Sequence, residues 1–335
     1  MYAERPPDPD LAGRVACVWH QVSEAATTQL VVPDACVDLI WGPDGLFVAG
    51  PDTGPMPAPM APGDLFVGIR FRPGGVGDLL GVPLEELRDQ RIPLSALPTP
   101  FPSPDLDHAD LSDLPPTLDL SDLDSTLDLS GLDVSLLPPN LDLSDLDRGP
   151  GPGLDLDPSL ALSDLAPSPA TSLRDRPEGP PAARLGDPSD VPAARLGDPS
   201  DVLAARLAAT IQSRLEVMRS AVRARLARSA ALDPATRAIA TGLRKGRTVA
   251  DVAWSLGLSE RQLQRRSVTA FGYAPKTLQR IVRFQCALRL ARAGVPLAEV
   301  AVTAGYTDQA HLSHDVKRLS GVSLRGLVSP VRELA

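Results

Sequence analysis

The sequence is poor in cysteine and in aromatic residues. Only 3 of its 335 residues are cysteine, and Trp, Tyr and Phe together make up 4%. Cys17, Cys36 and Cys286 are widely spaced and odd in number, and no C-x-x-C pair occurs. This spacing argues against a structural zinc site and against a disulfide framework, so we expect neither a metal site nor a cofactor.

Long apolar runs are also absent from the sequence. No stretch reaches the roughly 18 apolar residues that a transmembrane helix requires. The opening MYAERPPDPD has neither the basic region nor the apolar region of a signal peptide. We therefore expect a soluble, cytoplasmic protein without a membrane partner.

The net charge of −9 conceals two segments of opposite sign. Residues 101–170 contain 15 Asp and a single Arg, whereas residues 235–335 contain 16 Lys and Arg against 6 Asp and Glu. The last 101 residues thus carry a net charge of +10. A strongly basic domain attracts polyanions, which makes nucleic acid the first candidate partner.

Residues 11–97 predict a small β-rich domain. Short apolar runs alternate with turn-forming Pro, Gly and Asp, and two short helices are expected near the end, at Gly75–Leu80 and Leu84–Asp89. Strands are expected at Arg14–Trp19, Gln29–Val32, Val37–Trp41, Leu46–Ala49 and Leu65–Phe71.

Residues 98–200 are of low complexity. Phrases of Leu, Asp and Ser are interrupted by Pro, and the unit PAARLGDPSDV then occurs twice, at 181–191 and 192–202. Two copies are too few for a solenoid, and the Asp spacing lacks the Gly and Glu of an EF-hand loop. Repelling Asp charges and Pro predict a disordered insertion, with an acidic partner-binding arm as the alternative.

Residues 203–231 predict an amphipathic connecting helix. Apolar residues recur at steps of three or four and form one stripe. The stripe consists of Leu203, Leu207, Ile211, Leu215, Met218, Val222 and Leu226. The first interpretation is a helix packed between two domains, and the alternative is a dimerisation helix.

Residues 234–335 predict an all-α domain in which one pattern occurs twice, at 249–263 and 297–312. Each copy has an Ala four residues before a Gly, and an apolar residue six or seven after it. These residues are Ala253, Gly257 and Leu263, then Ala301, Gly305 and Leu312. A small Ala lets two helices cross closely, Gly permits a tight left-handed turn, and Leu anchors the second helix. The pattern is that of a helix-turn-helix motif.

The second helix of each copy has a polar outer face. Arg261, Gln264 and Arg265 share one face of the first, because residues three and four apart are helical neighbours. Gln309, Ser313 and His314 share a face of the second, with Lys317 one turn further on. Arg and Gln can pair with guanine and adenine edges in a major groove, whereas Lys suits phosphate.

Residues 234–328 resemble the DNA-binding domain of the AraC/XylS family of transcription regulators. The resemblance includes the long linking helix PKTLQRIVRFQCALRLARAG at 275–294 and the tail from Gly305 to Ser323. It implies DNA contacts from both recognition helices. By position these fall on Ser259, Arg261, Gln264, Arg265, Gln309, Ala310, Ser313, His314 and Lys317.

Three residues depart from the family pattern. Ser267 and Val316 stand where members usually carry Phe or another large apolar residue, and Leu324 replaces a usual Pro. We expect these changes to thin the core and lower stability without abolishing DNA binding.

The N-terminal segments P-D-A-C-V-D-L-I-W at 33–41, A-G-P-D-T at 49–53 and G-I-R-F-R-P-G at 68–74 resemble an uncharacterised domain that often precedes this unit. The resemblance implies a sensor or dimerisation domain. Arg70 and Arg72 share one strand face and are weak candidates for gripping an anionic ligand, unless they are salt-bridged with Asp38 or Asp64. Cys36 is either a reactive thiol or a small buried hydrophobe.

The sequence as a whole therefore predicts an α+β multidomain protein. It combines a small β-rich N-terminal domain, a disordered insertion and an all-α C-terminal domain with two helix-turn-helix motifs. We predict a non-enzymatic, sequence-specific regulator that reads two successive major grooves. The predicted partners are double-stranded DNA, RNA polymerase and an unknown small-molecule effector, and monomer and homodimer both stay open. The alternatives are a scaffold with an acidic arm and an enzyme fused to a DNA-binding unit.

Overall fold

The computed structural model describes residues 1–98 and 199–328, with only the backbone described at 199–202. Residues 1–98 and 200–328 belong to one compact unit. Apart from its ends, the disordered insertion predicted at 98–200 lies outside the described residues. In the described ranges no helix is both long enough and apolar enough to cross a membrane.

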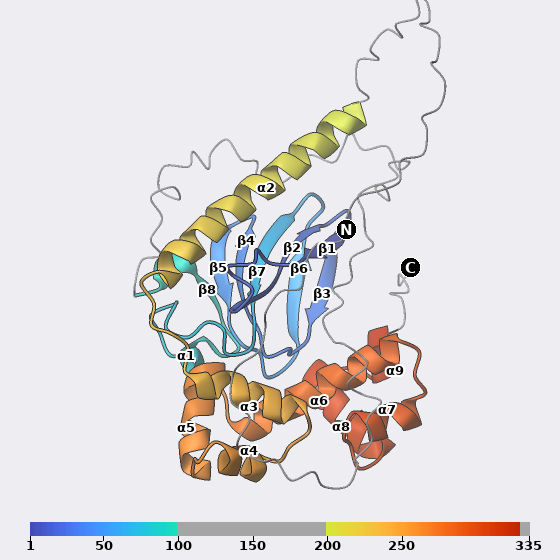
Figure 1. Ribbon diagram of the computed structural model, residues 1–335. Coiled ribbons are helices and arrows are strands. Elements are labelled where there is room, and N and C mark those ends of the chain that lie inside the picture. The colour runs from blue at the N-terminus through green and yellow to red at the C-terminus, as the bar shows by residue number, and fades with distance from the viewer. Residues whose placement is uncertain (99–198, 329–335) are drawn as a thin grey trace, which may run out of the picture. The chain divides into compact units, whose positions relative to one another are not determined.

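The N-terminal part is built on a six-stranded antiparallel sheet (Figure 1). Its strands lie in the order β1-β2-β7-β4-β5-β8, and β3 and β6 pair separately in a two-stranded sheet. The strands are β1 Tyr2–Arg5, β2 Val15–Val22, β3 Thr27–Val31, β4 Val37–Gly42, β5 Gly45–Ala49, β6 Met56–Met60, β7 Leu65–Phe71 and β8 Arg91–Pro93. The predicted β-rich domain is confirmed.

Three strands were not predicted, and one predicted helix is wrong. β1 lies before the expected start of the domain, β8 has only three residues, and β6 is the Pro-rich stretch MPAPM. Proline is tolerated in β6 because an edge strand needs no donor on its outer side. The helix expected at Gly75–Leu80 is replaced by turns, because Gly74 and Gly77 adopt positive φ. A short helix, α1 Leu84–Leu87, and the 3-10 turn η1 Leu94–Ala96 follow.

Helix α2, Pro199–Leu226, packs across one face of the sheet (Figure 1). It begins and ends earlier than the predicted 203–231, but its apolar stripe lies where the sequence placed it. The stripe residues Leu207, Ile211, Leu215, Met218 and Val222 are at most 8% exposed and share a core with Leu39, Val67 and Ile69 of the sheet. The apolar stripe is thus buried against the sheet of the same chain.

Arginines of α2 also connect the helix to the sheet domain. Arg223 forms ion pairs with Asp8 and with Asp10, the latter at 2.7 Å. Nε of Arg225 donates to the carbonyl of Leu79 at 2.7 Å. The guanidinium of the buried Arg214 lies 5.3 Å from the ring centre of Trp41. The long stems of these arginines also cover apolar surface beside the stripe.

The opposite face of the sheet carries a polar row beside an aromatic cluster. Cys17, Arg70 and Asp38 are aligned across β2, β7 and β4. Next to them Trp19 lies flat over Gly68, where a Cβ would come within 2.2 Å of the indole. Only glycine permits this approach, which explains the glycine in the middle of a central strand.

The C-terminal part is all-α, as predicted, and contains seven helices in its described residues (Figure 1). They are α3 Pro234–Arg244, α4 Val249–Ser255, α5 Glu260–Phe271, α6 Pro275–Arg292, α7 Leu297–Thr303, α8 Gln309–Ser320 and α9 Leu324–Val328. Their apolar faces form one core around α6, whose Leu278, Ile281, Phe284 and Ala287 are fully buried.

The structure accommodates the three departures from the family pattern. Ser267 is fully buried, but its hydroxyl donates to the carbonyl of Tyr273 at 2.9 Å, so its polar atom is satisfied. Val316 is 0% exposed and Leu324 is 5% exposed, so both side chains still occupy core positions. The lowered stability expected from these residues stays a prediction.

Candidate nucleic-acid interface

The first helix-turn-helix consists of α4, a short turn and α5. Thr248 caps α4 through a reciprocal pair of bonds with Asp251, and Ser259 caps α5 in the same way with Gln262. Such capping boxes satisfy backbone donors that a helix start leaves open. Gly257 in the turn has a φ of 64°, a left-handed conformation that favours glycine. The local sequence therefore fixes both helix starts and the turn between them.

The second helix-turn-helix, α7 and α8, repeats this construction. Gly305 in its turn has a φ of 79°, and the Asp308 carboxylate caps α8 by accepting from the His311 amide at 2.7 Å. Ala253 and Ala301, at the crossing points of the two copies, are 3% and 1% exposed. The predicted anchors Leu263 and Leu312 are 0% and 1% exposed. Burying these positions turns the opposite faces of α5 and α8 outward.

All nine residues assigned to DNA contact are exposed. They are Ser259, Arg261, Gln264 and Arg265 at α5, and Gln309, Ala310, Ser313, His314 and Lys317 on α8. Ser259 is engaged in the capping box of α5. For the polar side chains of the others, the described part of the chain supplies no hydrogen-bond or ion-pair partner. They are therefore available for an external partner.

The two recognition helices are anchored by different polar contacts. Arg266 of α5 forms an ion pair with Asp233 at 2.7 Å. The buried Asp315 of α8 faces Arg280 of α6 at 3.6 Å, and Arg283 stacks over the Tyr306 ring at 5.2 Å. The first pair joins α5 to the start of α3, and the second joins α8 to α6, so both helices have polar links to their neighbours in addition to their buried apolar residues.

Sequence reasoning missed a pair of exposed apolar residues. Trp254 is 85% exposed and Val302 is 74% exposed. Each lies three residues before the turn glycine of its copy, so the two positions are equivalent. Aligning the two copies with each other reveals this correspondence, because the buried Ala immediately precedes the exposed residue in both.

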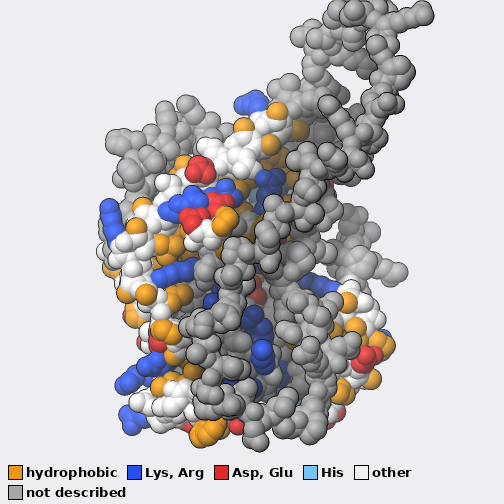
Figure 2. All heavy atoms as spheres, viewed as in Figure 1, with side chains coloured by type: hydrophobic (Ala, Val, Ile, Leu, Met, Phe, Trp, Pro, Cys, Tyr) orange, Lys and Arg blue, Asp and Glu red, His pale blue; other side chains and the backbone are white. Residues whose placement is uncertain are grey.

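Basic side chains are prominent on the visible surface of the helical domain. Figure 2 shows Lys and Arg gathered at the lower left of the view, where α4 and α5 lie in Figure 1. The charge agrees with the +10 of residues 235–335. Such a surface favours phosphate contacts and salt-dependent binding.

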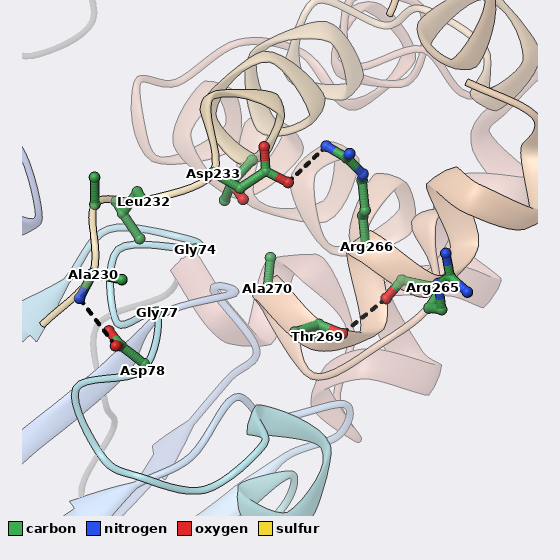
Figure 3. A pocket seen from close by; sticks show the side chains of 12 residues that line it. Gly74, Gly77, Asp78, Ala230, Leu232, Asp233, Arg265, Arg266, Thr269 and Ala270 are labelled. Atoms are coloured by element: carbon green, nitrogen blue, oxygen red, sulfur yellow. Dashed lines mark hydrogen bonds and ion pairs between the residues drawn. The ribbon is translucent and has the colours of Figure 1, made fainter. Parts of the chain in front are cut away.

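A cavity of about 360 Å³ borders the first recognition helix (Figure 3). It lies between the glycine-rich turn that follows β7, the segment that precedes α3, and α5. Its lining includes Gly74, Gly77, Leu232, Thr236, Arg265 and Ala270. At its rim the Asp78 carboxylate accepts from the Ala230 amide at 3.1 Å, and Asp233 pairs with Arg266. The cavity thus contacts both the sheet domain and α5.

The weak ligand candidates of the sheet domain are engaged in internal contacts. Arg70 pairs with Asp38 at 3.1 Å, and Nε of Arg72 donates to the Ala12 carbonyl at 2.8 Å. Burial and the Asp34 carboxylate raise the pKa of the Cys36 thiol, which disfavours the reactive thiolate. Among the described residues, no group of three or more His, Cys, Asp or Glu could hold a metal ion.

Two family models match the chain. Residues 252–328 match a helix-turn-helix domain, and residues 3–93 match a domain of unknown function, DUF6597. The C-terminal part is thus an AraC-type helix-turn-helix domain, which confirms the resemblance seen in the sequence. No curated protein matches the chain. This domain supports binding to double-stranded DNA and a role as a DNA-binding transcription regulator.

Two solved structures show similarity to the chain. The C-terminal domain of AraT, a response regulator from Geobacillus stearothermophilus, is 24% identical to this chain, with a TM-score of 0.29. The match covers 32% of this chain and 94% of the AraT chain. ToxT from Vibrio cholerae is 9% identical to this chain, with a TM-score of 0.30. The match covers 92% of this chain and 96% of the ToxT chain. Because both TM-scores are low, neither structure indicates what this chain binds.

Proposed function

We propose that the protein regulates transcription by inserting α5 and α8 into two successive major grooves of one DNA site. The observation that carries this proposal is the pair of helix-turn-helix units on one chain, each with an exposed polar face on its second helix. A regulator bound in this way acts through RNA polymerase, which we propose as its protein partner. Because both units lie on one chain, a monomer suffices for binding.

The length of α6 supports reading of two grooves. Its 18 residues join the two units. At about 1.5 Å per residue the helix spans roughly 27 Å, somewhat less than the 34 Å or so of one DNA turn. Two recognition helices held at this separation can enter neighbouring grooves on one side of DNA, especially when the DNA bends toward them.

Substitutions should separate base reading from phosphate binding. Arg265→Ala should weaken binding to the selected site by about 1–3 kcal/mol and relax its preference at one base pair, because a bidentate base contact is lost. Lys317→Ala should weaken binding to all sequences alike and lower the salt slope by about 1, because a single phosphate contact is lost. Binding to a library of sites at several salt concentrations measures both effects.

Arg237→Ala serves as the matched control, because Arg237 is an exposed arginine of α3 outside both motifs. It should leave the base preference unchanged. Equal loss of specificity from Arg265→Ala and Lys317→Ala would contradict the assigned roles. A single protected groove in hydroxyl-radical footprints would contradict the use of both units.

The cavity beside α5 supports control by a small effector. Its volume lies at the lower end of the range for small-molecule sites. We propose that an effector bound there shifts the turn at Gly74–Gly77 against α5 and so changes DNA affinity. The ligand would contact both the sheet domain and the recognition helix α5, so its binding would be coupled directly to the DNA affinity of α5.

Filling the cavity tests this route without knowledge of the ligand. Ala270→Phe places a ring between α5 and the glycine-rich turn, and should lower DNA affinity by about fivefold, because α5 is displaced from its packed position. Ala205→Phe, at an exposed site of α2, makes the same chemical change and should have no effect. Fluorescence anisotropy with labelled DNA measures both. Unchanged affinity in Ala270→Phe would exclude the cavity as a control point.

A further inference from the structure

The sheet domain contacts the C-terminal end of the first recognition helix. Gly272 ends α5 in a left-handed conformation, and its carbonyl accepts from Nη1 of Arg88 at 3.3 Å. A Cβ on Gly272 would lie 2.8 Å from Cγ of Pro51 and 2.9 Å from the carbonyl oxygen of Leu84. Helix α1 packs against α5 at the same place. Only glycine fits this junction, so the contact is close.

The same loop of the sheet domain lies beside the end of the second recognition helix. Gly321 ends α8, again with a positive φ, and a Cβ there would lie 3.6 Å from Cγ of Pro55. Pro51 and Pro55 both belong to the loop at residues 50–55, between β5 and β6. We call these residues the cap-bridging loop, because they lie beside the C-caps of both α5 and α8.

The cap-bridging loop is held by a dense set of hydrogen bonds. The Asp89 carboxylate accepts from the backbone amide of Thr53 at 2.6 Å and from its hydroxyl at 2.8 Å. The Asp52 carboxylate accepts two bonds from Arg91, at 2.9 and 2.8 Å. Two charge-assisted anchors within two residues make a rigid loop. A rigid loop of this kind can hold the helix ends beside it in fixed positions.

A third contact fixes the sheet domain on the helix that joins the two motifs. Nε2 of Gln285, in α6, donates to the carbonyl of Pro33 at 2.6 Å. Ala35 is 3% exposed and belongs to the core of the helical domain. The loop and this contact hold α5, α6 and α8 from one side. The shared core around α6 already holds both helices, and these contacts give them a second support from the sheet domain.

We infer that the cap-bridging loop is a specificity determinant, which sets the geometry at which α5 and α8 enter the DNA. This inference rests on the proposed function, since it requires that both helices read DNA. Pro51 and Arg88 position α5, and Pro55 positions α8. The sheet domain thereby selects the number of base pairs between the two groove sites, without contacting any base itself.

The test uses the full chain and a series of sites in which the two groove sequences are separated by different numbers of base pairs. The wild-type protein should prefer one spacing sharply. Pro51→Ala with Arg88→Ala, and separately Pro55→Ala, should lower affinity for the best spacing and reduce the penalty at neighbouring spacings by about fivefold, because the helices can then tilt independently. Pro43→Ala, in the turn between β4 and β5, is the matched control and should retain the wild-type profile.

The outcomes separate this inference from the proposed function. Wild-type spacing profiles in both loop variants would overturn the role of the loop while leaving two-groove reading intact. A wild-type protein that protects one groove and ignores spacing would overturn both. Pro55 is exposed, so Pro55→Ala leaves the folded core intact and keeps the test decisive if the double variant unfolds. Thermal unfolding of each variant verifies its folding.

Discussion

Replacing Leu215 by Ala should destabilise the protein by about 2–5 kcal/mol, the range for deleting a buried leucine side chain. Leu215 is 1% exposed and lies in the middle of the α2 stripe that covers the sheet. Its removal leaves a cavity between helix and sheet that neither element can close by itself. Urea unfolding followed by circular dichroism measures the loss, and Gln212→Ala, at an exposed position of the same helix, should cost far less.

This substitution also decides between the two interpretations of α2. If the stripe packs on the sheet, Leu215→Ala lowers the free energy of unfolding and leaves the sedimenting mass unchanged. A dimerisation helix requires the opposite result, a changed mass with little loss of stability at high protein concentration. That result would contradict the packing seen here.

The helical domain could be predicted from sequence because its determinants are local. A capping box such as Ser259 with Gln262, or a turn glycine such as Gly257, is defined by residues within one helical turn. The recognition faces followed from helical spacing for the same reason. The structure adds the exposure of each face, since burial of Leu263 and Leu312 determines which side turns outward.

The sheet domain was harder to predict because its pairings join distant segments. β1 pairs with β2, and β8 pairs with β5. The paired strands are separated along the sequence, so a local sequence pattern does not show which strands pair. The proximity of Pro51 and Pro55 to the two helix caps is of the same kind. The glycines at these caps are visible in the sequence as helix stops, but their second role, admitting the sheet domain, depends on packing that only the fold reveals.

The row of charges on the sheet was foreseen only in part. Salt-bridging of Arg70 with Asp38 was considered from the sequence, and the structure has this pair at 3.1 Å. Glu4 at 3.4 Å and Asp34 at 3.6 Å complete the cluster, so three carboxylates surround one guanidinium. Glu4 belongs to β1, which the sequence did not predict. The cluster makes Arg70 a structural counter-ion within the sheet domain.

Arg70→Met should therefore destabilise the protein at neutral pH by about 2–4 kcal/mol. The loss lies below that for a fully buried pair, because a quarter of the Arg70 side chain is exposed. Burial already raises the pKa of the Asp38 carboxyl, and Arg70 opposes this rise. Without Arg70 that pKa rises further, and the folded state then favours protonated Asp38. The destabilisation should be fully present at pH 7 and should shrink as the pH falls through the raised pKa toward about 4.

The double variant Arg70→Met with Asp38→Asn provides the matched test, since it removes the nearest of the three carboxylates that Arg70→Met leaves unpaired. It should recover part of the lost stability at pH 7 and show a weaker pH dependence than Arg70→Met alone, because one of the titrating carboxyls is gone. Urea unfolding of the wild type, both single variants and the double variant at pH 7 and pH 5 completes the cycle. Additive losses at both pH values would show that Arg70 and Asp38 are not coupled, and the role of Arg70 as counter-ion would then be wrong.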